Sequence, residues 1–315
     1  MKREVLCIFA PHIYDGMNKY LVILTLAVMV IACKEKEPES LQRLHQLESE
    51  YEKSKDPKVL ETLLAEYIAF VTGSTGDKAQ KIAVLEDAEK TSTANNRFFE
   101  SVTFLNTLIK EDPDSPKNSD RLLQLADLMK NVIRNESAAR TLYSGFLDKY
   151  PDHPKAVEVK LALGNQVIPL KEIIQTMAAR MYDDSLHQFN ESAATQYVDA
   201  TEAYVLINPH DPESPDLLNK AAETARSLKT YNKAISLYDW VIEKYPASKI
   251  APQALFLKAF TFDNELHDID NARFYYQEFI KRYPTADFAD DAKVLMDNLG
   301  KSDQEFLESI QKQNK

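Results

Sequence analysis

The side chains in this sequence that could perform acid–base or metal chemistry stand apart from one another. The six histidines occur singly, without the His-x-x-x-His or Glu-x-x-His spacing of metal sites. Carboxylates are paired at Asp183-Asp184 and Asp290-Asp291, but such pairs on amphipathic helices usually belong to solvated faces or first turns. No Gly-x-Ser-x-Gly elbow is present. We therefore predict no catalytic residues, no metal and no cofactor, hence no enzyme. A helical hydrolase with two distant carboxylates is the alternative.

One glycine-containing stretch could suggest phosphate binding. Residues 72–76 read Thr-Gly-Ser-Thr-Gly, and Lys78 follows, whereas a P-loop needs Gly-x-x-x-x-Gly-Lys-[Ser/Thr] after a strand. The spacing differs, and both flanks carry apolar residues at helical spacing. This stretch is predicted to be a turn between helices.

A residue pattern that recurs along the sequence predicts the helices that would position any functional side chain. Ala, Tyr, an apolar residue, Tyr and Pro recur at fixed offsets in three segments, which are Ala139, Tyr143, Phe146, Tyr150 and Pro151; Ala234, Tyr238, Val241, Tyr245 and Pro246; and Ala272, Tyr276, Phe279, Tyr283 and Pro284. The first three residues of each copy form one helical stripe, in which the small Ala lets a neighbouring helix approach closely. The Pro ends the helix. A second amphipathic segment precedes each copy, so each unit is predicted to be a helical hairpin.

The unit that ends at Pro246 resembles the tetratricopeptide repeat family, whose pattern spans about 34 residues. The matching positions are Leu218, Ala222, Ala225, Tyr231, Ala234, Tyr238, Val241 and Pro246. The units ending at Pro151 and Pro284 have one residue more in the inter-helix turn. The resemblance implies an all-α fold, namely an α-α superhelix of helical hairpins. An unrelated helical bundle is the alternative.

Apolar runs keep a helical period from Leu41 onward. We predict N-terminal helical repeats over residues 41–165 and C-terminal tetratricopeptide repeats with a capping helix over residues 166–315. Ser115-Pro116 and Ser214-Pro215 each precede a hairpin. We expect each Ser to be a helix N-cap and each Pro the first helical residue, which suggests that the two halves are diverged copies.

Residues 17–33 resemble a bacterial lipoprotein signal peptide. Met17 and Lys19 form a short basic start, residues 20–32 are apolar or small, and Cys33 ends the run. The resemblance implies that the Cys33 thiol takes a diacylglycerol group before cleavage leaves it N-terminal. The apolar run is shorter than the roughly 20 residues of a membrane-spanning helix, although a transmembrane anchor is the alternative. We expect residues 1–33 to form the signal-peptide region, with Met17 as the natural start.

A charged tether, residues 34–40, follows the cysteine and would hold the folded body clear of the bilayer. Lys34 occupies the position at which some bacteria place an aspartate that retains lipoproteins at the inner membrane. We therefore expect a lipid-anchored protein of the outer membrane, on the periplasmic side, with the cell surface as the alternative. The net charge of −11 disfavours nucleic acid as a partner.

The resemblance also implies a ligand face, since the first helix of each tetratricopeptide hairpin lines the binding groove. Phe256 and Phe260 map to this face one helical turn apart, where they could anchor an apolar residue of a peptide. The alternative is that the C-terminal helix, with Phe288, covers both rings. The residues predicted to bind a partner are Asn219, Glu223, Arg226, Gln253, Phe256, Phe260 and Asp263.

Together these patterns predict a lipid-anchored scaffold or adaptor that binds protein or peptide partners in the cell envelope. Its repeat units are similar to those of the outer-membrane β-barrel assembly lipoprotein and the periplasmic Tol-Pal coordinator. The alternative is a glycan- or nutrient-capture lipoprotein that works with an outer-membrane transporter, because such proteins also carry these repeats.

Overall fold

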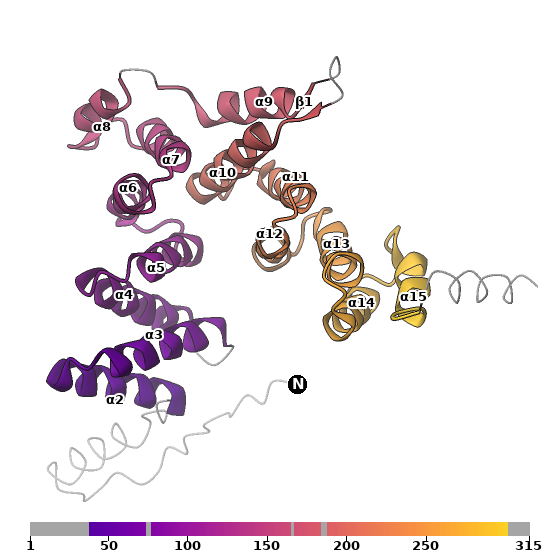
Figure 1. The fold of residues 1–315 in the computed structure, drawn as a ribbon, viewed down its shortest axis with the longest axis horizontal. Coiled ribbons are helices and arrows are strands. Elements are labelled where there is room, and N and C mark those ends of the chain that lie inside the picture. Colours follow the sequence, from indigo (N-terminus) through magenta and orange to yellow (C-terminus); the bar gives the residue numbers. More distant parts are fainter. Residues whose placement is uncertain (1–37, 74–76, 165–166, 184–187, 302–315) are drawn as a thin grey trace, which may run out of the picture. The chain divides into compact units, whose positions relative to one another are not determined.

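The computed structural model describes residues 38–73, 77–164, 167–183 and 188–301, and it confirms the all-α fold of helical hairpins (Figure 1). Contacts between Cα atoms divide the chain into two compact units, one up to Asp77 and one from Lys78. The signal-peptide region, Cys33 and nearly all of the tether lie outside the described residues. Within the described residues, no helix is long and apolar enough to cross a membrane.

The first unit is a helical hairpin of α2 (Glu39–Ser54) and α3 (Pro57–Thr72). Asp56 caps α3, because its side chain accepts a hydrogen bond from the backbone N–H of Lys58 at 2.9 Å. The two helices bury Leu44, Leu63 and Tyr67 between them, and the Tyr67 hydroxyl donates to Glu48 at 2.7 Å. This unit therefore has a small core of its own.

The second unit stacks its helices in chain order, apart from α10, which packs against both α7 and α9. Its helices are α4 (Lys78–Ala94), α5 (Phe98–Glu111), α6 (Asn118–Leu128), the π-helix η1 (Met129–Ile133), α7 (Glu136–Lys149), α8 (Ala156–Ala162), α9 (Leu170–Arg180), α10 (Glu191–Ile207), α11 (Ser214–Ser227), α12 (Tyr231–Lys244), α13 (Ala251–Asn264), α14 (Ile269–Arg282) and α15 (Ala289–Asp297). In Figure 1, α4 to α7 form one row and α11 to α14 another, with α10 between them.

A short antiparallel pair of strands interrupts the helical chain. β1 (Tyr182–Asp183) pairs with β2 (Gln188–Phe189), with Tyr182 opposite Phe189. The apolar period did not predict this pair, because two residues per strand are too few to show an alternation.

The turns inside four of the hairpins have two lengths. In α4–α5, Asn96 has a φ of 57° and the N–H of Arg97 donates to the Ser92 carbonyl at 2.8 Å. In α11–α12, the N–H of Thr230 donates to the Ala225 carbonyl at 2.9 Å in the same way. The shared turn shows that α4–α5 is a hairpin of the same kind, although its sequence lacks the Tyr-Pro ending.

The hairpins α6–α7 and α13–α14 use a longer turn, as their extra residue predicted. The N–H of Asn135 donates to the Met129 carbonyl at 2.9 Å, and that of Asp268 donates to the Phe262 carbonyl at 2.8 Å. Each bond reaches back six residues instead of five. In α6–α7 the additional residue is taken up by the π-helical end of the first helix.

The second helices of five hairpins end with one backbone conformation. Their C-cap residues have φ between −131° and −123° and ψ between 46° and 67°, and each precedes a proline; they are Asp112, Tyr150, Asn208, Tyr245 and Tyr283. A residue before proline is disfavoured in the helical region. The Tyr-Pro pattern therefore identified three of five equivalent helix ends.

The two Ser-Pro dipeptides are not equivalent, and the expectation that both serines are N-caps was wrong. Ser115 lies before α6 in the connecting turn, where its N–H donates to the Asp112 carbonyl at 3.1 Å. Its structural counterpart is Asp211, whose N–H donates to the Asn208 carbonyl at the same distance. Ser214 is already the first residue of α11, and its hydroxyl donates to the Asn208 carbonyl.

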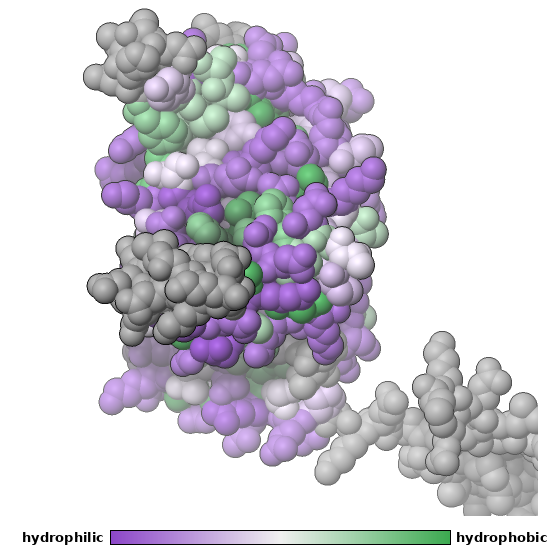
Figure 2. All heavy atoms as spheres, turned by 90° about the vertical axis from the view of Figure 1, so that its right-hand side faces the viewer, coloured by the Kyte–Doolittle hydropathy of each residue, from purple (hydrophilic) through white to green (hydrophobic). Residues whose placement is uncertain are grey.

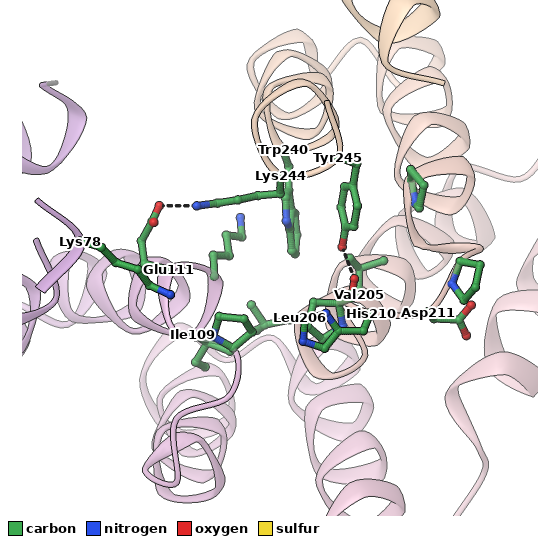
Figure 3. A pocket seen from close by; sticks show the side chains of 15 residues that line it. Lys78, Ile109, Glu111, Val205, Leu206, His210, Asp211, Trp240, Lys244 and Tyr245 are labelled. Carbon is green, nitrogen blue, oxygen red and sulfur yellow. Dashed lines mark hydrogen bonds and ion pairs between the residues drawn. The ribbon is translucent and has the colours of Figure 1, made fainter. Parts of the chain in front are cut away.

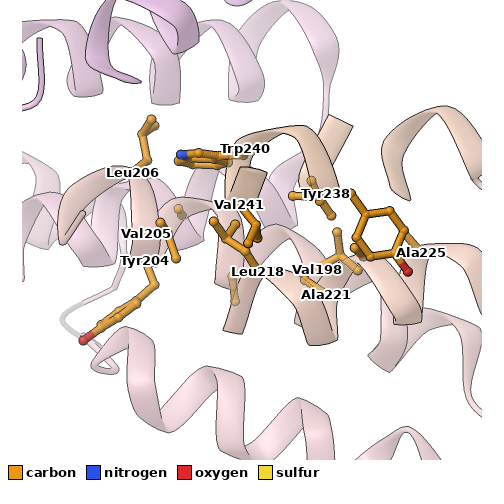
Figure 4. Packing of buried hydrophobic residues seen from close by; sticks show 14 of the residues in the cluster. Val198, Tyr204, Val205, Leu206, Leu218, Ala221, Ala225, Tyr238, Trp240 and Val241 are labelled. Atoms are coloured by element: carbon orange, nitrogen blue, oxygen red, sulfur yellow. The ribbon is translucent and has the colours of Figure 1, made fainter. Parts of the chain in front are cut away.

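One cluster of buried residues extends from α5 to α15. Figure 4 shows a part of this core, where α10, α11 and α12 pack together. Gly145 lets α7 approach its neighbours closely, because a Cβ there would lie 2.3 Å from Ile207 and 2.7 Å from Leu170. The domain boundary expected between residues 165 and 166 consequently falls inside one compact unit, and the chain divides after Asp77 instead. The physical reason is the packing of α7 against α9 and α10.

Candidate functional site

The predicted partner-binding residues on α11 and α13 form a polar network. Asn219 donates to Glu223 Oε1 at 2.7 Å along α11, and Gln253 donates to the same oxygen at 3.4 Å from α13. The guanidinium carbon of Arg226 lies 5.6 Å from the centre of the Phe260 ring, within the range of a cation–π contact. We call the surface formed by Asn219, Glu223, Arg226, Gln253 and Phe260 the α11–α13 face.

Three buried polar atoms at the α11–α13 face accept or donate no hydrogen bond to any described residue. They are Oδ1 of Asn219, Nη1 of Arg226 and the hydroxyl of Tyr238. Burial raises the pKa of the Tyr238 hydroxyl; the nearby Arg226 charge lowers it and the Glu223 charge raises it further. The tyrosine of α12 therefore belongs to the same site. These three atoms are shielded from solvent, and Asn219 and Tyr238 are buried. The side chains of the face that remain partly exposed are Glu223, Arg226, Gln253 and Phe260.

The structure corrects the expectation that Phe256 is open to a groove. Phe256 is only 8% exposed, and its ring stacks on Phe288 at 4.7 Å between centroids. It also contacts Phe279 at 5.7 Å. The alternative, in which the C-terminal segment covers the ring, describes Phe256, while Phe260 stays half-buried. The physical reason is that Phe288 immediately precedes α15, which packs on α14.

Asp263 lies one turn beyond Phe260, and its side chain bonds to a residue of its own hairpin. It accepts a hydrogen bond from the Tyr276 hydroxyl at 3.3 Å. Burial raises the pKa of Asp263, whereas the bond from Tyr276 and the charge of His267 lower it. Five of the seven predicted residues are thus brought together. Partner binding by all seven stays a prediction.

A second site, which the sequence did not predict, lies between α5, α10 and α12. One cavity of about 540 Å³ is lined by side chains from the ends of these helices and from the prolines that follow them (Figure 3). Lys244 forms an ion pair with Glu111 at 2.8 Å, and the Tyr245 hydroxyl donates to the Pro209 carbonyl at 2.9 Å. The ion pair connects α12 with α5, and the hydrogen bond connects the end of α12 with the segment that follows α10.

A neighbouring cavity of about 590 Å³ is lined by residues of α5, α6, α7, α10 and α12. It contains the ion pair of Lys233 with Glu202, at 3.0 Å. Burial raises the pKa of Asp199 to about 6, and the charge of Glu202 adds to this, whereas Lys233 and a hydrogen bond from Asn135 lower it. A carboxyl with such a pKa changes its charge close to neutral pH.

Lys110 and Trp240 stand where the two cavities meet, since both residues line both cavities. The Lys110 ammonium lies 3.8 Å from the centre of the Trp240 ring. Burial lowers the pKa of Lys110, with Glu202 opposing this effect. We call the two cavities together the Lys110–Trp240 cleft.

The one sequence signal for this cleft was the departure of Trp240 from the repeat. Trp240 occupies the position held by Gly145 and Glu278 in the other two copies. Nothing in the sequence linked it to Lys110, because the contact joins helices from different hairpins.

The polar character of the surface is seen on the side formed by α13 to α15. Figure 2 shows hydrophilic residues over most of that side, with hydrophobic side chains in small separate groups among the described residues. Among the residues the structure describes, no group of three or more His, Cys, Asp or Glu side chains could hold a metal ion.

Two segments of the chain, residues 122–153 and 253–286, match the tetratricopeptide repeat family model. The chain contains tetratricopeptide repeats. The matches cover hairpins α6–α7 and α13–α14, whose turns are the longer ones, while α11–α12 lies outside both. Such repeats indicate a protein-interaction scaffold. No curated protein matches the chain.

Proposed function

We propose that this protein is a lipid-anchored scaffold of the bacterial outer membrane that binds an extended peptide segment of an envelope protein on its α11–α13 face. The observation that carries the proposal is the half-buried ring of Phe260 with the Arg226 guanidinium beside it. The partly exposed carboxylate of Glu223 lies on the same face and is linked by hydrogen bonds to both helices. The face thus offers an apolar ring, a guanidinium that donates hydrogen bonds and a carboxylate that accepts them.

An extended peptide supplies the complementary groups, because every residue except proline carries one backbone N–H and one carbonyl. Its N–H groups can donate to the Glu223 carboxylate, and its carbonyls can accept from the Arg226 guanidinium. Phe260 offers an apolar contact beside them, held by Arg226 and by a stacked arrangement with Phe256 at 6.3 Å. Hydrogen bonds to these two charged groups, beside an apolar contact, would let a small surface contribute strongly to affinity.

The membrane location rests on the sequence of residues 17–40. Cys33 at the end of a short apolar run supports lipidation, and the charged tether supports a body held away from the bilayer. The similarity of the repeat units to those of the β-barrel assembly lipoprotein and the Tol-Pal coordinator supports a role in envelope assembly, on the periplasmic side.

The glycan-capture alternative is less well supported. Carbohydrate-binding sites commonly stack sugars on open aromatic rings. The single tryptophan, Trp240, is only 6% exposed and is covered by Lys110.

Two experiments test the proposal separately. For the anchor, Cys33→Ala should move the protein from the membrane to the soluble fraction and abolish fatty-acid labelling. Unchanged partition and labelling would contradict lipidation.

For the α11–α13 face, peptides selected by display on the full chain should bind at least about 10-fold more weakly to Arg226→Ala, as expected for loss of a charged hydrogen bond. Arg273→Ala, an exposed arginine of α14, is the matched control and should bind normally. Equal binding by both variants would show that the peptides do not bind to the α11–α13 face.

A further inference from the structure

Two charged side chains of the Lys110–Trp240 cleft, Lys110 and Asp199, form no ion pair with another described residue. Around it, Lys244 pairs with Glu111 and Lys233 pairs with Glu202. Lys110 forms no ion pair with a carboxylate of the described residues and instead stands over the Trp240 ring. A partly buried ammonium is unfavourable without an anion, so Lys110 offers a site for a negatively charged group.

Asp199, in the same cleft, is an acidic side chain without an ion-pair partner among the described residues. It lines the larger cavity, and no lysine or arginine of the described residues forms an ion pair with it. The neighbouring Lys233 directs its ammonium to both oxygens of Glu202, at 3.0 and 3.2 Å. Asp199 therefore offers a site for a positively charged group.

The cleft has apolar side chains in its lining, beside polar ones such as Asn106, Thr107 and Ser236 in the larger cavity. Leu125, Met129, Leu142 and Leu206 line the larger cavity, and Leu206 with Trp240 continues into the smaller one. The volumes of about 590 and 540 Å³ are within the range of small-molecule sites. Lys110 and Asp199 form no ion pair with each other, which means that one ligand reaching both needs its two charges apart.

We propose that the Lys110–Trp240 cleft binds short apolar peptides with free ends, whose carboxylate pairs with Lys110 and whose ammonium pairs with Asp199. An anion without an ammonium would leave Asp199 unpaired, and an amine without a carboxylate would leave Lys110 unpaired. A free α-amino acid carries its charges on one carbon, whereas a di- or tripeptide separates them and brings apolar side chains. This site is distinct from the α11–α13 face, which holds a segment of a protein chain.

The chain contains a single tryptophan, so its intrinsic fluorescence reports on this cleft. The full-length protein is titrated with Leu-Leu and Leu-Leu-Leu, and binding is measured by fluorescence and, independently of Trp240, by calorimetry. The N-acetylated and the C-amidated forms of each peptide are titrated in parallel. At least one free peptide should bind with a dissociation constant below about 1 mM, and each blocked form should bind at least about 10-fold more weakly.

Variants assign the two ends of the ligand. Lys110→Met should weaken binding of the free peptide by at least about 10-fold, and amidation should then cause no further loss of affinity. Asp199→Asn should weaken binding by a similar factor, and acetylation should then cause no further loss. Lys281→Met and Asp270→Asn, at exposed positions of α14, are the matched controls and should bind as the wild type does.

Three results would overturn the proposal: no binding of either peptide by either method, equal binding of free and blocked peptides, or unchanged affinity in both cleft variants. The blocked peptides test the wild-type protein, so the answer does not depend on how well a variant folds.

Discussion

The α11–α13 face and the Lys110–Trp240 cleft differ in what brings their side chains together. The face is made by neighbouring hairpins whose residues recur at fixed positions of the repeat, so Asn219, Arg226 and Gln253 are placed by periodicity. The cleft is made where Lys110 of α5 meets Trp240 of α12. The difference teaches that a repeat pattern finds sites between adjacent units and misses sites between distant ones.

One position of the repeat shows how a site between distant hairpins arises. Gly145 lets α9 and α10 pack closely on α7, Trp240 covers the core beside Lys110, and Glu278 is half-exposed on α14. The same place in three hairpins is therefore a close contact, a cleft wall and a solvated surface. Each environment predicts a different response to mutation.

The largest expected effect is a difference in stability loss between alanine variants of Phe256 and Phe260. Phe256→Ala should lower the free energy of unfolding by about 3–5 kcal/mol, because it removes a buried ring packed on Phe279 and Phe288. Phe260→Ala should lower it by about 1 kcal/mol, since Phe260 is half-buried. Urea denaturation of both variants measures the difference. Equal losses would mean that the two rings share one environment.

A smaller effect is expected at the equivalent positions Gly145 and Glu278. Gly145→Leu should destabilise the protein by about 1–3 kcal/mol, because its side chain would meet Ile207 and Leu170. The matched change Glu278→Leu should alter stability by less than about 0.5 kcal/mol. Thermal and urea unfolding measure both. A tolerated leucine at position 145 would show that α7 does not pack closely on α9 and α10.

The smallest stability effect is a pH dependence in the cleft. Because the pKa of Asp199 is raised to about 6 from 3.8, the folded protein binds more protons than the unfolded chain between these values, and this carboxyl lowers stability as pH rises through that window. The groups facing it are Glu202, Lys233 and Asn135.

Asp199→Asn should therefore stabilise the protein by roughly 1–2 kcal/mol at pH 8, with no gain near pH 4. Urea unfolding from pH 4 to pH 8 measures this difference. A gain that is constant over the whole range would exclude titration of Asp199 as its source.

The sequence predicted the fold well because repeated residues carry it. Tyr238, Tyr276 and Phe279 were expected on the apolar stripes of their helices, and all are fully buried. The helix ends at Asp112 and Asn208 were missed because neither residue is tyrosine, although the backbone and the following proline are the same.

The candidate sites were less predictable for physical reasons. The orphan hydroxyl of Tyr238 depends on side-chain geometry that a pattern of apolar and polar residues does not contain. The burial of Phe256 depends on where the segment with Phe288 folds back. The contact of Lys110 with Trp240 depends on the curvature summed over several hairpins, which no single repeat specifies.

The most direct test of the account is photocrosslinking in intact cells, with a photoreactive phenylalanine analogue in place of Phe260. The matched control is the same analogue in place of Phe274, which is 57% exposed on α14. The account predicts one discrete protein adduct from position 260, lost when Asn219→Ala and Arg226→Ala are added, and no such adduct from position 274. The same adduct from both positions, or an adduct from position 260 that persists in the double variant, would contradict the assignment of the α11–α13 face as the partner-binding surface.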